Sequence, residues 1–231
     1  MTCILQTSAT VHQGDINGIR SVPASRCALL GDHAAVLYRD RVLTYRQLDE
    51  RSTRLANALL ELGLVKGDRV AIQSRNCAEL VEIECALYKA GLVKAALNPR
   101  FTDMEAADVV ENCTPRVLIA GPGYTAYSAS SPGFGSIETF VAIGKAPAGY
   151  VDYETLLARA ASQPPETTPS PDDLAVLHFS SGSTGKIKAA MQTYGNRMAS
   201  LRKMLLGMDR PARAGDRLAL IGSSSACLGS M

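Results

Sequence analysis

Residues 174–188, LAVLHFSSGSTGKIK, join an apolar run to a loop rich in hydroxyl groups and glycine. The apolar character of Leu174–Phe179 predicts a strand that is buried on both faces. Ser180–Gly185 then offers four hydroxyls and two glycines in six residues, followed by Lys186 and Lys188. Glycine lets backbone amides converge on an anion, and hydroxyl and ammonium groups add donors and positive charge. The stretch therefore predicts a strand that ends in a phosphate-binding loop.

Outside this stretch, strand-like and helix-like segments alternate. Threonine capping boxes mark two helix starts, Thr44 with Gln47 and Thr102 with Glu105, and Gly63 and Gly91 mark two helix ends. The apolar patterns predict a hairpin at 35–44, strands at 68–73, 92–97, 116–120, 139–143, 174–179 and 217–221, and helices at 44–62, 77–90, 102–113 and 196–208.

Strands that alternate with helices of this length are typical of βαβ crossovers. The fold class predicted is α/β, a layered αβα sandwich with largely parallel sheets. Residues 121–135 are rich in Gly, Ser and Tyr and predict a long surface loop, and residues 161–173 contain four prolines and predict an exposed linker. The linker divides the chain into a first subdomain at 1–160 and a second part at 174–231, which carries the strand, the phosphate loop and the following helix and strand.

Composition excludes several classes of function. The net charge is only +2 and the 24 basic residues are scattered, so a nucleic-acid partner is not expected. No apolar run approaches the roughly 18 residues that a membrane-spanning helix needs. The six cysteines form no CxxC pair, and no secretory signal precedes them, so neither a metal site nor a disulfide framework is expected. We expect a cytoplasmic protein that acts on small molecules.

The loop resembles the signature loop of the adenylate-forming (AMP-binding) superfamily, which includes acyl-CoA synthetases. Phe179, Ser180, Ser181, Gly182, Ser183, Thr184, Gly185 and Lys188 stand where the pattern Tyr/Phe-Thr/Ser-Ser-Gly-Ser/Thr-Thr-Gly-x-Pro-Lys-Gly places them. It is not a Walker A loop, because Ser180 stands where that motif needs a glycine. The resemblance extends upstream to 43–49, 66–70 and 88–91, so it covers most of the chain. Residues 97–105 and 113–118 are similar to acyl-CoA ligases and favour a fatty or aryl acid over an amino acid.

The resemblance implies the following chemistry. ATP and a carboxylic acid give an acyl-adenylate and pyrophosphate, and coenzyme A then takes the acyl group as co-substrate. The β- and γ-phosphates of ATP would be held by Ser180, Ser181, Gly182, Ser183, Thr184, Gly185 and Lys188. Lys188 would be the catalytic cation, and magnesium would bridge phosphate oxygens; no metal-ligating residue is assigned in this sequence. The sequence departs from the pattern at Ile187 and Ala189, where the family has proline and glycine.

The later segments of the family have no counterpart in this sequence. We therefore expect residues 1–231 to be a partial N-terminal AMP-binding domain, incomplete and without the C-terminal lid domain, and to be inactive when isolated. Two alternatives stay open, a non-catalytic nucleotide- or partner-binding fragment and an amino-acid-activating adenylation domain. An incomplete sheet would leave an unpaired edge, so association of copies through this edge is expected. His178 is expected to be a packing residue and not a general base.

Overall fold

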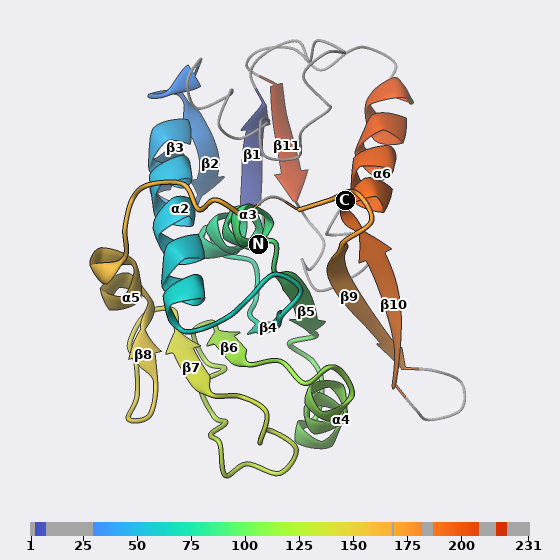
Figure 1. The fold of residues 1–231 in the computed structure, drawn as a ribbon. Helices are drawn as coiled ribbons and strands as arrows, with labels where there is room; N and C mark the ends of the chain where they lie inside the picture. The colour runs from blue at the N-terminus through green and yellow to red at the C-terminus, as the bar shows by residue number, and fades with distance from the viewer. Residues whose placement is uncertain (1–2, 8–29, 168, 182–186, 208–215, 221–231) are drawn as a thin grey trace.

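The computed structural model describes residues 3–7, 30–167, 169–181, 187–207 and 216–220. Within these residues the chain forms two sheets and five helices (Figure 1). The strands are β1 (Cys3–Thr7), β2 (Ala34–Tyr38), β3 (Arg41–Thr44), β4 (Arg69–Gln73), β5 (Val93–Leu97), β6 (Val117–Ala120), β7 (Thr139–Ala142), β8 (Val151–Asp152), β9 (Leu174–Ser181), β10 (Ile187–Thr193) and β11 (Asp216–Leu220). The helices are α2 (Tyr45–Glu61), α3 (Glu79–Ala90), α4 (Asp103–Cys113), α5 (Tyr153–Arg159) and α6 (Tyr194–Leu206).

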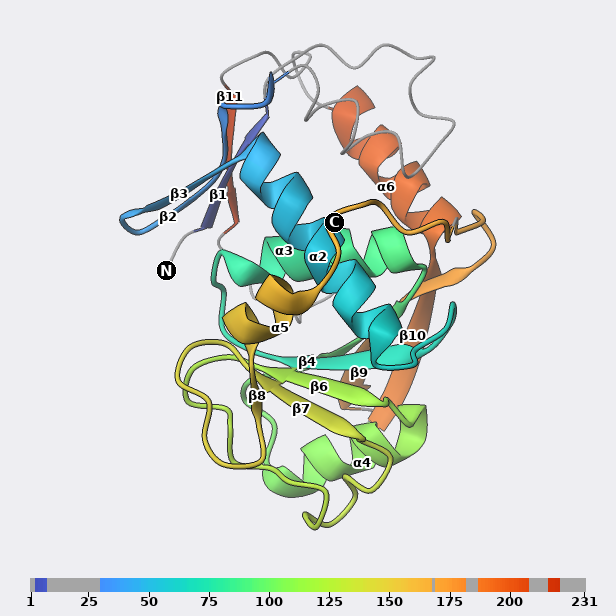
Figure 2. The ribbon, with the colours of Figure 1, turned by 60° about the vertical axis from the view of Figure 1, so that its left-hand side comes forward.

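The larger sheet has seven strands in the order β10-β9-β5-β4-β6-β7-β8. Every neighbouring pair is parallel except β9 and β10, which are antiparallel. Helices α2, α3 and α5 lie over one face of this sheet and α4 lies under the other (Figure 2). The predicted α/β class with a largely parallel sheet and helices on both faces is confirmed.

Local sequence explains where the helices begin and end. Thr44 and Thr102 accept from the N3 amides of α2 and α4, and the side chains of Gln47 and Glu105 reach back, so both predicted capping boxes are present. Gly91 ends α3 in the left-handed conformation that glycine adopts without strain, with φ of 67°.

Each face of the sheet has its own apolar core. On one side, α2 and α3 cover β4 and β6, so Leu55 and Leu59 pack with Ile83, Ile72 and other fully buried residues. On the other side, α4 contributes Val109 and Val110, and the core extends to β9 and β10. Burial of both faces explains why the central strands are mostly apolar and do not alternate regularly with polar residues.

The smaller sheet has the order β11-β1-β2-β3. β1 pairs antiparallel with both β2 and β11, and Cys3 is the register partner of Leu220. Residues from opposite ends of the sequence thus lie in neighbouring strands (Figure 1). The predicted hairpin at 35–44 is β2 and β3, which turn at Arg39 with φ of 51°.

Four elements lie outside the sequence prediction: β1, β8, α5 and β10. The prediction of one continuous loop over 180–188 was wrong at both ends. Ser180 and Ser181 are the last residues of β9, and Lys188 belongs to β10. Cross-strand pairing extends both strands into the polar segment, although its residue types favour a turn.

The proline-rich segment 161–173 contacts helix α2. The amide of Asn57 donates to the carbonyl oxygens of Ala161 and Gln163, both at 2.7 Å. Arg54 donates to the carbonyl oxygen of Ala160 at 2.9 Å. These hydrogen bonds hold the segment against α2 before the chain enters β9. Strand β9 then pairs with β5, in the same sheet as β4. The division of the chain at this segment stays a prediction.

Candidate functional site

The predicted phosphate loop lies at the end of the β9–β10 hairpin. Ser180 is the register partner of Lys188, and Ser181 is the partner of Ile187. The predicted site residues Gly182, Ser183, Thr184 and Gly185 lie outside the described residues. The structure therefore places the backbone at both borders of the predicted site, and the side chains of two of its residues, Ser180 and Lys188.

Ser180 and Lys188 are side by side on the surface. Residues directly opposite in an antiparallel pair have Cβ atoms about 4.5–5.5 Å apart and point to the same face. Both side chains are exposed, and Lys188 forms no ion pair with any other part of the chain that the structure describes. A hydroxyl donor and a cation therefore face solvent together, which is the pairing of groups that an anionic oxygen requires.

The opposite face of the hairpin is anchored in the core. Ile187 is 9% exposed and belongs to the same apolar cluster as Leu177 and Leu97. Its register partner Ser181 is the last residue of β9. The proline that the signature pattern has at position 187 is thus replaced by a residue whose side chain fixes β10 against the core.

His178 lies two residues before Ser180 and is buried. Its Nε2 is 3.2 Å from Oε1 of Gln192 on β10. Burial, together with repulsion from Lys94 and Arg197, lowers the pKa of the imidazole below its usual 6.5. The ring is therefore neutral at pH 7 and bridges the two strands, which agrees with the packing role expected from the sequence.

The far end of β10 is fixed by the first turn of α6. Thr193 and Asn196 form a capping box, which the sequence analysis missed because Asn replaces the usual Glu or Gln. Tyr194 is 1% exposed, and its hydroxyl donates to the carbonyl oxygens of Leu87 and Leu92 at 3.3 and 3.1 Å. Gly195 is needed where it stands, because a Cβ there would lie 3.0 Å from the carbonyl oxygen of Pro171.

Three charged residues beneath the hairpin also escaped sequence analysis. Lys94 on β5 pairs with Glu84 on α3, and Arg197 on α6 reaches the same carboxylate at 3.6 Å. The sequence did contain a signal for this cluster. Lys94 interrupts the apolar run 92–97, and a lysine in a strand buried on both faces requires an acidic partner.

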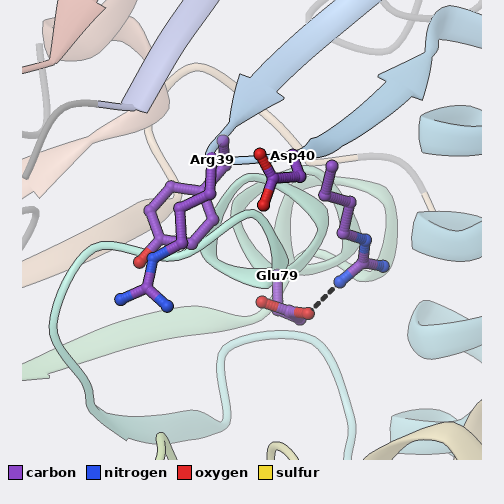
Figure 3. Close-up of a pocket in the computed structure, with 5 residues that line it drawn as sticks. Arg39, Asp40 and Glu79 are labelled. Atoms are coloured by element: carbon purple, nitrogen blue, oxygen red, sulfur yellow. Dashed lines mark hydrogen bonds and ion pairs between the residues drawn. The ribbon is translucent and has the colours of Figure 1, made fainter.

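An open pocket of about 460 Å³ lies elsewhere, lined by Tyr38, Arg39, Asp40, Arg41 and Glu79. Figure 3 shows Arg39 and Asp40 on the turn between β2 and β3, above Glu79 at the start of α3. Arg41 and Glu79 already form an ion pair, so the charges in this pocket compensate each other. None of the residues predicted for the phosphate site lines it; Ser180 and Lys188, whose side chains the structure describes, lie on the β9–β10 hairpin.

Metal-binding clusters and membrane-spanning helices are both absent from residues 3–7, 30–167, 169–181, 187–207 and 216–220. No group of three or more His, Cys, Asp or Glu side chains there is arranged to hold a metal ion. No helix in these ranges combines the length and the apolar character needed to cross a membrane.

Comparison with known proteins gives a consistent result. The family described as AMP-binding enzyme matches residues 24–231. A feruloyl-CoA synthase from an Amycolatopsis species is 31% identical over 211 residues, which cover 89% of this chain and 39% of that protein. The structure of a putative long-chain-fatty-acid CoA ligase from Rhodopseudomonas palustris superposes with a TM-score of 0.72 and is 29% identical in sequence. The match covers 81% of this chain and 47% of that ligase. The anthranilate CoA ligase AuaEII in complex with anthranoyl-AMP is similar in fold, with a TM-score of 0.74 and 23% identity. This match covers 82% of this chain and 37% of AuaEII. The chain spans less than half the length of these relatives.

Proposed function

This chain belongs to the AMP-binding enzyme family, and we propose that it supplies the ATP-phosphate-binding part of an acid–thiol ligase. In the proposed reaction, ATP activates a carboxylic acid to an acyl-adenylate with release of pyrophosphate, and coenzyme A then takes the acyl group. The observation that carries this proposal is the register pair of Ser180 and Lys188, exposed at the borders of a segment of Ser, Thr and Gly.

The proposed binding mode uses the predicted site residues. Ser180, Ser181, Gly182, Ser183, Thr184 and Gly185 would donate to the β- and γ-phosphates, and Lys188 would neutralise their charge. Magnesium would be held by phosphate oxygens. The fit is supported by the solvent-facing hydroxyl of Ser180 and by the exposure of Lys188 without an acidic partner among the described residues.

The acyl substrate proposed is a fatty or aryl acid. Feruloyl-CoA synthase is named for the thioester of ferulic acid, which carries an aromatic ring, and the ligase from Rhodopseudomonas palustris is named for a long-chain fatty acid. We also keep the proposal that residues 1–231 bind ATP without forming acyl-CoA by themselves; an assay with ATP, coenzyme A and a panel of acids tests it. A cytoplasmic location and association of copies through an exposed sheet edge stay predictions.

The direct test is calorimetric titration of the chain with ATP and magnesium, compared between the native chain and Lys188→Ala. Loss of one charge-assisted contact costs about 1.5–3 kcal/mol, so the dissociation constant should rise about 10- to 150-fold. Lys145→Ala is the matched control, because Lys145 is an exposed lysine on the turn after β7. Unchanged affinity in Lys188→Ala, or an equal loss in both variants, would sink the assignment.

A further inference from the structure

The ion cluster beneath the hairpin joins three elements that are distant in the sequence. Lys94 lies on β5, Glu84 on α3 and Arg197 on α6, and only 2% of the Lys94 side chain is exposed. A buried charge is costly unless it is paired, and removing one partner leaves the others uncompensated. The cluster therefore links α6 to the central sheet through one shared carboxylate.

The stoichiometry of the cluster makes Glu84 essential to it. Two cations share one carboxylate, and Nη1 of Arg197 is buried without a hydrogen-bond partner among the described residues. The guanidinium also lies over the ring of Tyr88 at 5.2 Å, and that ring meets Tyr194 edge to face with centroids 5.2 Å apart. Glu84 is thus the only acidic group that holds Arg197 in the described part of the chain.

Strand register connects this cluster to the predicted phosphate loop. On β5, Lys94 pairs with Val176 of β9, and two residues further along, Ala96 pairs with His178. Alternation puts His178 and Ser180 on the same face of β9 as Val176. Among the described strands, β10 pairs only with β9. Its start is held by Ile187 in the core beside α4, and its end is held by α6, which follows directly after Thr193.

We infer that Lys94 is a positioning residue: by pairing with Glu84 it holds Arg197, and with it α6, and so sets the position of the β9–β10 hairpin that carries Lys188. The effect on ATP rests on the function proposed above. The effect on the hairpin rests only on the contacts described here. Because only 2% of its side chain is exposed, Lys94 acts through Glu84 and Arg197.

The first experiment measures hydrogen–deuterium exchange in the full chain, in the native form and in Lys94→Met. Methionine keeps most of the apolar stem and removes the charge. We expect amides of 187–203 to exchange at least about tenfold faster, because the cluster no longer opposes local opening, while β4 and β6 keep their native rates. Native rates in 187–203 would overturn the inference.

The matched control for this experiment is Lys89→Met. Lys89 also lies on a buried interface, where its ammonium bonds to Asp49, Ser52 and Thr53 of α2. Lys89 lies on α3, as Glu84 does, but its partners are on α2 and not on α6. A general loss of stability would raise exchange in both variants, so equal acceleration of 187–203 in Lys89→Met would also overturn the inference.

The second experiment follows the ATP dissociation constant from pH 5.5 to 8.5 in the native chain, Lys94→Met and Lys94→Met/Glu84→Gln. Burial favours a neutral carboxyl, so removal of Lys94 should raise the pKa of Glu84, and protonation of Glu84 as the pH falls should release Arg197. The groups that face Glu84 are Lys94 of β5, His178 of β9, Arg197 and Tyr194 of α6, and Tyr88 of its own helix.

The expected result is an affinity loss of about tenfold at the acidic end in Lys94→Met, absent from the native chain and from the double variant. A loss of equal size at every pH would mean a purely structural role and contradict the inference. If the native chain binds no ATP, the proposed function fails, and the exchange experiment alone decides the role of Lys94.

Discussion

The hydroxyl of Tyr153 donates to the carboxylate of Glu82 at 2.9 Å, and both side chains are fully buried or nearly so. This contact joins α5, a helix of seven residues, to α3. Glu82 also accepts from Arg51 at 2.8 and 3.0 Å and from Arg41 at 3.4 Å. A single buried carboxylate therefore ties together α5, α3, α2 and β3.

Tyr153→Phe should lower the free energy of unfolding by about 1–3 kcal/mol, because the buried carboxylate loses a donor that nothing replaces. Urea denaturation followed by circular dichroism measures the change. Tyr124→Phe is the comparison, since the hydroxyl of Tyr124 accepts from Arg75 at an exposed contact, and its loss should stay within about 0.5 kcal/mol. A neutral Tyr153→Phe would show that Glu82 is satisfied by arginine alone.

Arg51→Met should cost more, about 3–5 kcal/mol, because it removes the two shortest ion contacts of a carboxylate that is 0% exposed. Arg46→Met provides the contrast. Arg46 pairs with Asp32 where both side chains are largely exposed, so its loss should cost about 0–1 kcal/mol. The same denaturation measurement separates the two cases, and equal costs would contradict the role of burial.

Gly121→Ala should destabilise the chain by about 1–3 kcal/mol through overpacking. A Cβ at Gly121 would lie 2.1 Å from Oγ and 2.7 Å from Cβ of Ser74, so the two loops at the ends of β4 and β6 would separate. Gly135→Ala is the control, because a Cβ there meets nothing within 4 Å. Ser74→Gly in the Gly121→Ala background should restore most of the loss; if it does not, the clash lies elsewhere.

Stability should fall between pH 7.5 and 5.5, and part of the fall should vanish in His178→Gln. Burial lowers the folded-state pKa of His178, so the unfolded chain binds more protons as the pH falls below 6.5. The contribution of His178 is complete above the unfolded-state pKa and is lost at lower pH. Urea midpoints at the two pH values measure this difference, and an identical pH dependence in both proteins would contradict it.

The sequence predicted the elements that depend on local interactions. The capping boxes at Thr44 and Thr102 and the glycine end of α3 at Gly91 act within a few residues, so composition and spacing were sufficient. Strand order was not predictable, because β9 pairs with β5 across more than seventy residues of intervening chain. The helix α5 has too few residues to show a 3.6-residue period.

The candidate site shows the same limit. The loop residues and Lys188 were found from residue types, but β10 was missed because Lys188, Ala189, Ala190 and Met191 are all exposed and lack strand alternation. The cluster of Lys94, Glu84 and Arg197 depends on how three distant elements meet. The one sign of this cluster in the local sequence is Lys94, which interrupts the apolar run 92–97.

The pairing of β1 with β11 has a consequence for synthesis of the protein. β1 is synthesised about two hundred residues before its partner strand at Asp216–Leu220. At about 5–20 residues per second, β1 would wait roughly 10–40 s with one of its edges open. The helices and the parallel strands β4 to β7 can collapse during this interval, so the smaller sheet closes after this part of the larger sheet has formed.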